Sequence, residues 1–229
     1  MKWRLIESAP SDAPNNMAID EALFCAQARN PEFTPTLRVY TWNKPCVTIG
    51  YFQKYTEFTQ SSLPVVRRLT GGLSVAHGND ISYALIANHV AWKSVYDQEK
   101  TYESIHAVIK EALSLSGIET DFVSPAEENY RNAGGNLCVK TLYRHDLKSG
   151  ARKILGSCQR RRGSNLLVQG SIHLPHAVET TRFCCNLRLS LKKYTGCAVE
   201  SGSLSADESA SAQALAETKY QSLAWNNKL

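Results

Sequence analysis

Hydrophobic residues recur with a helical period in three segments of this chain. Residues 13–29 follow an Asn/Pro-rich start, place acidic residues early and repeat apolar residues every three or four positions. Residues 101–117 carry the same period and stop at Gly117, and glycine commonly ends helices. The pattern therefore predicts two amphipathic helices here and a last helix over residues 206–224, after a Gly/Ser-rich stretch at 196–205.

Short alternating or apolar runs elsewhere in the chain predict β-strands. These runs cover residues 36–42, 46–51, 63–68, 80–87, 137–139, 153–160 and 165–174. Lys44-Pro45 separates the first two runs, which suggests a hairpin, whereas residues 124–136 have no apolar period and predict a loop. Because the strands cluster and the helices stand apart, we expect an α+β fold with a largely antiparallel central sheet flanked by helices.

The composition is that of a globular protein. The chain has 229 residues, 43% hydrophobic and 21% charged, which suits one domain over residues 1–229. No run of 18 apolar residues and no signal peptide is present, and seven cysteines are scattered through apolar patterns. We therefore expect a cytoplasmic protein in a reducing compartment, with no membrane partner.

The net charge of the chain and the spacing of its possible metal-binding residues exclude several classes of function. The net charge of +5 favours an acidic partner or a phosphate-bearing ligand. No C-x2-C pair or H-x3-H spacing appears, so we expect no metal site. No aromatic residues are interleaved with the basic run Arg160-Arg161-Arg162, so we expect no nucleic acid; the run predicts a solvated turn or a docking patch for an acidic partner.

Two cations precede a glycine pair in the segment Arg67-Arg68-Leu69-Thr70-Gly71-Gly72. Glycines admit close backbone approach and leave N–H groups that can face a carboxylate, thioester or phosphate oxygen. The alternative is a tight hairpin with two solvated arginines. The segment fits neither a P-loop nor a G-x-G-x-x-G dinucleotide fingerprint.

Lys153 and Cys138 are the candidates for covalent chemistry. Lys153 begins a strand, and in a pocket its ammonium could stabilise a developing oxyanion or, partly desolvated, act as a base. Cys138 lies between Leu137 and Val139, which is typical of a buried thiol, but a neighbouring cation would make it a nucleophile. An ordinary surface lysine and a packed cysteine are the alternatives.

Together these segments resemble the biotin/lipoyl attachment family, which includes lipoate-protein ligases and octanoyltransferases. The matching pieces are residues 16–22, 38–42 with 46–51, 67–72 with His77 and Asp80, and 152–161 with 169–172. The resemblance implies a fold like that of class II aminoacyl-tRNA synthetases and biotin ligases, with a pocket for an eight-carbon acyl chain. It also implies that Lys153 contacts the acyl carbonyl. The residues it implies for acyl or adenylate binding are Arg67, Arg68, Thr70, Gly71, Gly72, His77, Gly156, Ser157 and Gly170.

The resemblance further implies transfer of a lipoyl or octanoyl group to a lysine of an acidic lipoyl domain of a 2-oxoacid dehydrogenase or of the glycine-cleavage H protein. In transferases the group comes from a carrier-protein thioester through an acyl-cysteine. Cys138 through Leu147 fits the C-x8-L pattern of one octanoyltransferase branch. ATP and Mg²⁺ would be required only if the protein is a ligase that forms lipoyl-AMP as its intermediate.

Several features of the sequence depart from the family patterns. Ligases usually carry an Asn-Asp pair where this chain reads His145-Asp146, and many add a carboxy-terminal accessory domain, which we do not expect here. Leu73 stands at the third glycine of the family's G-G-G, and Gln169 stands at the usual histidine. A lipoyl-binding relative without turnover is therefore a third hypothesis.

Overall fold

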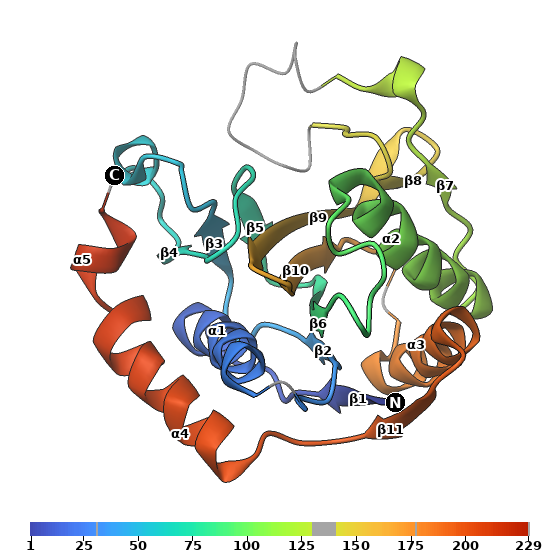
Figure 1. Ribbon diagram of the computed structural model, residues 1–229. Helices are drawn as coiled ribbons and strands as arrows, with labels where there is room; N and C mark the ends of the chain where they lie inside the picture. The colour runs from blue at the N-terminus through green and yellow to red at the C-terminus, as the bar shows by residue number, and fades with distance from the viewer. Residues whose placement is uncertain (31, 130–140, 177, 229) are drawn as a thin grey trace.

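An eight-stranded sheet forms the middle layer of the protein in a computed structural model that describes residues 1–30, 32–129, 141–176 and 178–228 (Figure 1). Its strands are β1 (Lys2–Glu7), β2 (Thr36–Tyr40), β6 (Ile81–Asn88), β7 (Asp121–Phe122), β8 (Leu147–Ser149), β9 (Arg152–Arg162), β10 (Asn165–Ile172) and β11 (Ala198–Ser201), in the order β11-β1-β2-β6-β10-β9-β8-β7. Strand β1 is parallel to both neighbours, and all other neighbouring pairs are antiparallel. The predicted α+β fold with a largely antiparallel sheet is confirmed.

Helices cover both faces of this sheet. They are α1 (Ala13–Arg29), α2 (Gln98–Leu115), α3 (Thr180–Thr195), α4 (Ala206–Leu215) and α5 (Leu223–Asn226), with short helical turns η1 (Tyr55–Phe58), η2 (Pro125–Glu127) and η4 (Ala216–Tyr220). Figure 1 shows α1 and α4 on one side of the sheet and α2 and α3 on the other. Two apolar clusters fill the two interfaces, one around Trp3, Leu85 and Ile109 and the other around Leu23 and Ile86.

The helix predictions hold where capping signals are local. Helix α1 has the predicted bounds, because the Asp12 side chain accepts a hydrogen bond from the Asn15 N–H and a proline lies in its first turn. Helix α2 begins earlier than predicted, since Asp97 caps it through the Lys100 N–H. The predicted last helix is broken into α4, the π-helical η4 and α5.

The predicted hairpin between residues 36–42 and 46–51 is wrong. Strand β2 pairs with β1 and β6, whereas β3 (Cys46–Ile49) pairs with β4 (Val65–Arg67) and β5 (Val75–His77) in a separate three-stranded sheet. Both edges of β2 are occupied by distant strands, so tertiary pairing overrides the local turn signal. The glycine pair lies in a strand-to-strand loop, as predicted, but the strand that follows it is β5 and not the predicted strand over residues 80–87. The predicted strand 137–139 and Cys138 fall outside the described residues.

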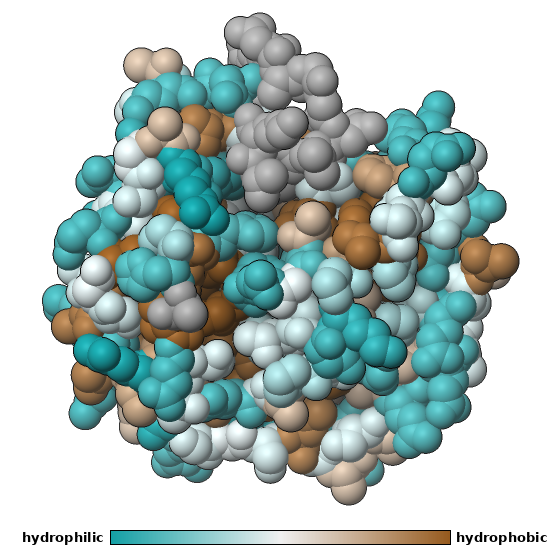
Figure 2. Space-filling model, turned by 180° about the vertical axis from the view of Figure 1, so that it is seen from behind, coloured by the Kyte–Doolittle hydropathy of each residue, from teal (hydrophilic) through white to brown (hydrophobic). Residues whose placement is uncertain are grey.

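The face of the molecule shown in Figure 2 is mostly polar. Teal, hydrophilic residues cover much of the face in Figure 2, and brown residues show mainly in its hollows. Among the described helices, none combines the length and the hydropathy that a membrane crossing requires.

Candidate functional site

A β-bulge turns Lys153 toward a pocket beside strand β9. Lys148 of β8 pairs with Lys153, but the adjacent Leu147 pairs with Leu155, so β9 carries one extra residue at this point. The bulge sets Lys153 beside Gly156: a Cβ added at Gly156 would lie 2.6 Å from Lys153 Cε and 2.8 Å from its Nζ. Gly156 therefore provides the space in which the lysine side chain lies.

Lys153 is buried and forms an ion pair with Asp146. Its Nζ lies 2.6 Å from Asp146 Oδ2 and donates to the Thr141 carbonyl at 2.8 Å. Burial raises the pKa of the Asp146 carboxyl, and the Lys153 charge opposes that rise. Asp146 is held in turn by the Tyr143 N–H, so a single turn presents the carboxylate to the lysine.

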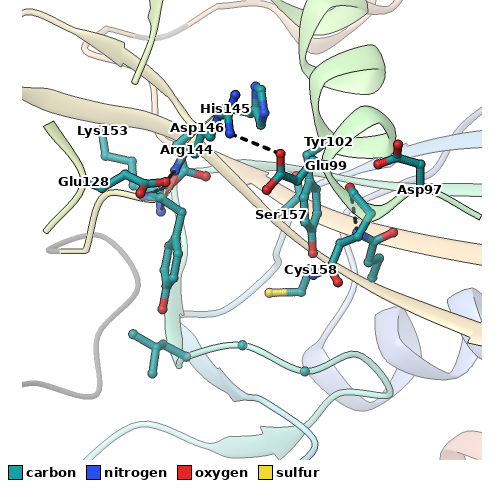
Figure 3. Close-up of a pocket in the computed structure, with 16 residues that line it drawn as sticks. Asp97, Glu99, Tyr102, Glu128, Arg144, His145, Asp146, Lys153, Ser157 and Cys158 are labelled. Carbon is teal, nitrogen blue, oxygen red and sulfur yellow. Dashed lines mark hydrogen bonds and ion pairs between the residues drawn. The ribbon is translucent and has the colours of Figure 1, made fainter. Parts of the chain in front are cut away.

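The outer pocket, which Lys153 and Asp146 line, has a volume of about 720 Å³ (Figure 3). It lies between β9, the start of α2, the turn at residues 143–146 and the glycine loop at 71–73. Four carboxylates line it against two permanent cations among the described residues; they are Asp97, Glu99, Glu128 and Asp146 against Arg144 and Lys153. Figure 3 shows Arg144 facing Glu99, which it contacts at 3.2 Å. The described lining therefore carries more negative than positive charge.

The two adjacent arginines predicted to bind the acyl group point to different places. Arg68 donates to the carbonyls of Gly71 and Leu73, at 2.6 and 2.7 Å, and lies 3.6 Å from Cys158 Sγ. Gly72 has a positive φ of 83°, and a Cβ there would lie 2.2 Å from the same sulfur. Arg68 and the glycine pair thus form one wall beside Cys158.

Arg67 does not join this wall. Its guanidinium donates to the carbonyls of Gly50, Tyr51 and Gln53 and to that of Asn226 in α5. It lines neither the outer pocket nor the inner cleft described next. The contacts assign Arg67 to holding the C-terminal segment and the loop after β3, away from Lys153.

An inner cleft of about 30 Å³ continues from the outer pocket on the α1 side of the sheet. Ser157 and Cys158 line both cavities. The remaining lining of the inner cleft mixes apolar, aromatic and polar residues; it comprises Met17, Tyr40, Trp42, Thr48, Arg68, Val75, His77, Ser82, Gly156, Gln169, Gly170 and Ser171.

His77 is fixed in this cleft by Asp80. Its Nδ1 lies 2.8 Å from Asp80 Oδ2, and its Nε2 lies 2.8 Å from the Thr48 hydroxyl. Burial alone would raise the pKa of Asp80, but hydrogen bonds from His77, Ser171 and the Gly78 N–H hold it well below the ordinary value. Asp80 therefore stays ionised and orients the imidazole.

Gln169, at the position of the family's usual histidine, connects three elements. Its Nε2 donates to Asp20 in α1 at 2.7 Å, while its Oε1 accepts from the Thr70 hydroxyl at 2.8 Å. Thr70 is fully buried and lines neither cavity, so its role here is to anchor the loop that carries the glycine pair.

Most predicted binding residues meet around these two cavities. Arg68, Gly71, Gly72, His77, Gly156, Ser157 and Gly170 line one or both of them, together with Lys153. Arg67 and Thr70 do not, and the predicted nucleophile Cys138 lies outside the described residues. The basic run at 160–162, for which a solvated turn was one prediction, instead ends strand β9, and the turn follows at Gly163.

Sequence reasoning missed three residues of the site. Asp146 was noted only as part of a departure from the ligase pattern, yet it pairs with Lys153. His106, in the middle of α2, reads as a core position and nevertheless contacts Ser157 at 2.8 Å. Cys158 belongs to the Lys153 segment in the sequence, and only the fold brings it beside Arg68. Long-range pairing of this kind leaves no local signal in the sequence.

Comparison of the sequence with known protein families identifies the class of catalytic domain. The chain belongs to the lipoyl protein ligase A/B catalytic domain family, whose sequence profile matches residues 12–202. The predicted family is thereby confirmed.

Two relatives carry the name octanoyltransferase LipM. The protein of Oceanobacillus iheyensis is 35% identical over 184 residues, which cover 78% of this chain and 66% of the relative. That of Clostridioides difficile is 35% identical over 187 residues, covering 78% and 68%. The chain therefore spans about two thirds of the length of these relatives. Their name agrees with the predicted transferase class.

Solved structures share the fold. A lipoate protein ligase of T. acidophilum with bound lipoic acid superposes with a TM-score of 0.79 at 19% identity, covering all of both chains. A lipoate-protein ligase A bound with ATP gives 0.78 at 18% identity, covering 99% of this chain and 98% of that one. These likenesses confirm the fold class.

Proposed function

We propose that this protein is an acyltransferase that attaches a lipoyl or octanoyl group to a specific lysine of a lipoyl domain or of the glycine-cleavage H protein. The observation that carries the proposal is the buried pair of Lys153 and Asp146 on the wall of the outer pocket. A buried ammonium next to a cavity can stabilise the oxyanion that forms when an acyl carbonyl is attacked. The octanoyltransferase relatives support the choice of acyl group.

In the favoured mechanism, the Cys138 thiolate attacks the carbonyl carbon of a thioester on an acyl carrier protein. The carrier leaves as a thiolate, and the acyl group stays on Cys138. The ε-amine of the acceptor lysine then attacks the same carbon, forms the amide and releases the Cys138 thiol. Lys153 stabilises the oxyanion in both steps.

The charge of the outer pocket supports a thioester donor. Asp97 and Glu128, the two carboxylates of the described lining that are not ion-paired with Arg144 or Lys153, attract the cationic side chain of an acceptor lysine. The same carboxylates repel the triphosphate that an ATP-dependent ligase must bind next to the acyl group. Arg144, one of the two opposing cations, is already paired with Glu99.

We place the acyl chain in the inner cleft, beyond Cys158. At about 30 Å³ the cleft holds little more than a water molecule, so an eight-carbon chain requires side chains there to move. Met17 lines the cleft, and methionine adapts readily because it is flexible. Arg68 and the glycine loop would then cover the acyl carbonyl.

The test compares two donors with one acceptor. The protein is incubated with a lipoyl domain and either octanoyl carrier protein or free lipoate plus ATP and Mg²⁺, and the acceptor mass is measured. We expect an octanoyl adduct from the carrier protein without ATP. Modification only with ATP would support the lipoyl-AMP ligase instead. Tight lipoyl binding with no acceptor modification from either donor would support a non-catalytic relative.

A further inference from the structure

Behind the pocket wall, a chain of hydrogen bonds connects α2 to the hydroxyl of Ser157. His106 Nδ1 lies 2.6 Å from the His145 carbonyl, and its Nε2 lies 2.8 Å from Ser157 Oγ. Tyr83 Oη lies 2.6 Å from the same Ser157 oxygen. Ser157 itself lines both cavities, whereas His106 and Tyr83 are buried and line neither.

These contacts fix the direction of every hydrogen bond. A carbonyl only accepts, so His106 Nδ1 carries the proton and donates it to the His145 carbonyl. Burial lowers the pKa of His106 to about 4, so the imidazole is neutral and its Nε2 is an acceptor. The Ser157 hydroxyl must therefore donate to His106, and Tyr83 must donate to Ser157.

Tyr83 can hold this donor role. Burial raises the pKa of its hydroxyl, which therefore keeps its proton. Gly170 makes the contact possible, because a Cβ there would lie 2.2 Å from Tyr83 Cε1 and 2.5 Å from Ser157 Oγ. The only hydrogen-bonding capacity that Ser157 Oγ has left for the pocket is a lone pair.

The same turn controls both Ser157 and Lys153. His145 has a positive φ of 70°, unusual for a residue with a side chain, and its carbonyl faces His106. The next residue, Asp146, faces Lys153. One strained turn thus orients the cation for the acyl oxygen and, through His106, the Ser157 hydroxyl.

We infer that His106 is a positioning residue that fixes Ser157 as a hydrogen-bond acceptor for the attacking lysine amine. The inference rests on the proposed function, because it assigns Ser157 to binding the acceptor lysine amine in the acyl-transfer step. An acceptor oxygen binds an amine N–H and cannot donate to an oxyanion. Lys153 stabilises the negative charge on the acyl oxygen, and Ser157 orients the nitrogen of the acceptor lysine.

His106 does not itself remove the amine proton. At pH 7 a group with a pKa of about 4 holds a proton in roughly one molecule in a thousand. When the amine nitrogen forms the bond to the acyl carbon, the departing Cys138 sulfur takes up the amine proton and leaves as the thiol.

The inference predicts that the two half-reactions separate. Both pass through an oxyanion, so loss of an oxyanion donor slows loading and transfer together. Loss of an amine acceptor slows only transfer. The test measures loading of the enzyme from octanoyl carrier protein and, in a single turnover, transfer from the loaded enzyme to a lipoyl domain.

In His106→Phe the Ser157 hydroxyl loses its acceptor and is free to turn its proton into the pocket. We expect transfer to slow by about 100-fold, the typical effect of misplacing a reacting group, with loading changed less than about twofold. His106→Gln can still accept from Ser157 and should restore most of the transfer rate. Ile105→Val, the neighbouring core position of the same helix, controls for packing and should leave both rates unchanged.

Ser157→Ala tests the same step without disturbing α2, and covers the case in which His106→Phe does not fold. It should slow transfer as His106→Phe does, and the double variant should be no slower than either single one. Equal slowing of loading and transfer, or unchanged transfer in folded Ser157→Ala, would overturn the inference. If the wild-type protein is not loaded by any donor, it is the proposed function that fails.

Discussion

Two buried carboxylate–cation pairs in this protein have nearly the same chemistry and different surroundings. Asp20 of α1 lies 2.7 Å from Arg38 of β2, and Asp146 lies 2.6 Å from Lys153 at the outer pocket. Burial raises the pKa of both carboxyls, and in each pair the cation opposes that rise. The difference lies in what else each pair can reach.

The Asp20 pair is closed on all sides by protein groups. Asp20 also accepts from Tyr40 and Gln169, while Arg38 donates to Ser8 and Asn16. The Lys153 pair borders a cavity of about 720 Å³. The comparison teaches that a buried ion pair holds elements together when its partners are all internal, and can act on a ligand when one side is open.

The largest expected effect is on stability. Asp20→Asn leaves Arg38 as an uncompensated buried charge, which typically costs about 3–5 kcal/mol in the free energy of unfolding. Denaturant titration measures this change. Asp121→Asn, at an exposed carboxylate, is the matched control and should shift the free energy of unfolding by less than about 0.5 kcal/mol. Equal stabilities of the two variants would contradict the view of a sealed, structural pair.

The second effect is on catalysis. Lys153→Ala should lower the rate of acyl transfer by about 100-fold or more, equivalent to about 3 kcal/mol, which is typical of losing one preorganised oxyanion donor. Its loss of stability should be smaller than that of Asp20→Asn, because water in the pocket can reach Asp146. Lys193→Ala, at a surface pair with Glu111, should retain the full rate. An active Lys153→Ala variant would remove the lysine from the mechanism.

The smallest expected effect concerns His106, a buried side chain that is neutral at pH 7, unlike the two ion pairs. Burial lowers the pKa of His106 from 6.5 to about 4, so the unfolded chain takes up a proton that the folded protein excludes. The contribution of His106 to the free energy of unfolding is complete above pH 6.5. About 2–3 kcal/mol of this contribution is lost as the pH falls toward 4. Unfolding measured across this range should show a weaker acid dependence in His106→Gln than in the wild type. The same slope in both would contradict the assignment.

The sequence predicts features that depend on neighbouring residues. Helix α1 has its predicted bounds because its cap, its proline and its apolar period are all local. The glycine loop between β4 and β5 was also predictable, because Gly-Gly is a strong turn signal. The placement of Lys153 followed from a resemblance over several ordered segments.

Features that depend on distant pairing could not be predicted. The local pattern gives Arg67 and Arg68 the same role, but Arg67 ends β4 and binds α5, whereas Arg68 follows the strand and reaches the pocket wall. The bulge that re-aims Lys153 and the contact of His106 with Ser157 depend on how β9 pairs with β8 and packs on α2. The expectation of a single domain over 1–229 and the role of Cys138 stay predictions.

The most direct test of the account is the mass of the protein itself after incubation with octanoyl carrier protein, without an acceptor. We predict one octanoyl adduct that maps to Cys138, is absent in Cys138→Ser, persists in the control Cys185→Ser and is discharged by a lipoyl domain. An adduct that maps to Cys158 would assign the role of nucleophile to Cys158. No adduct from the carrier protein, with acceptor modification only when ATP is supplied, would contradict the thioester mechanism.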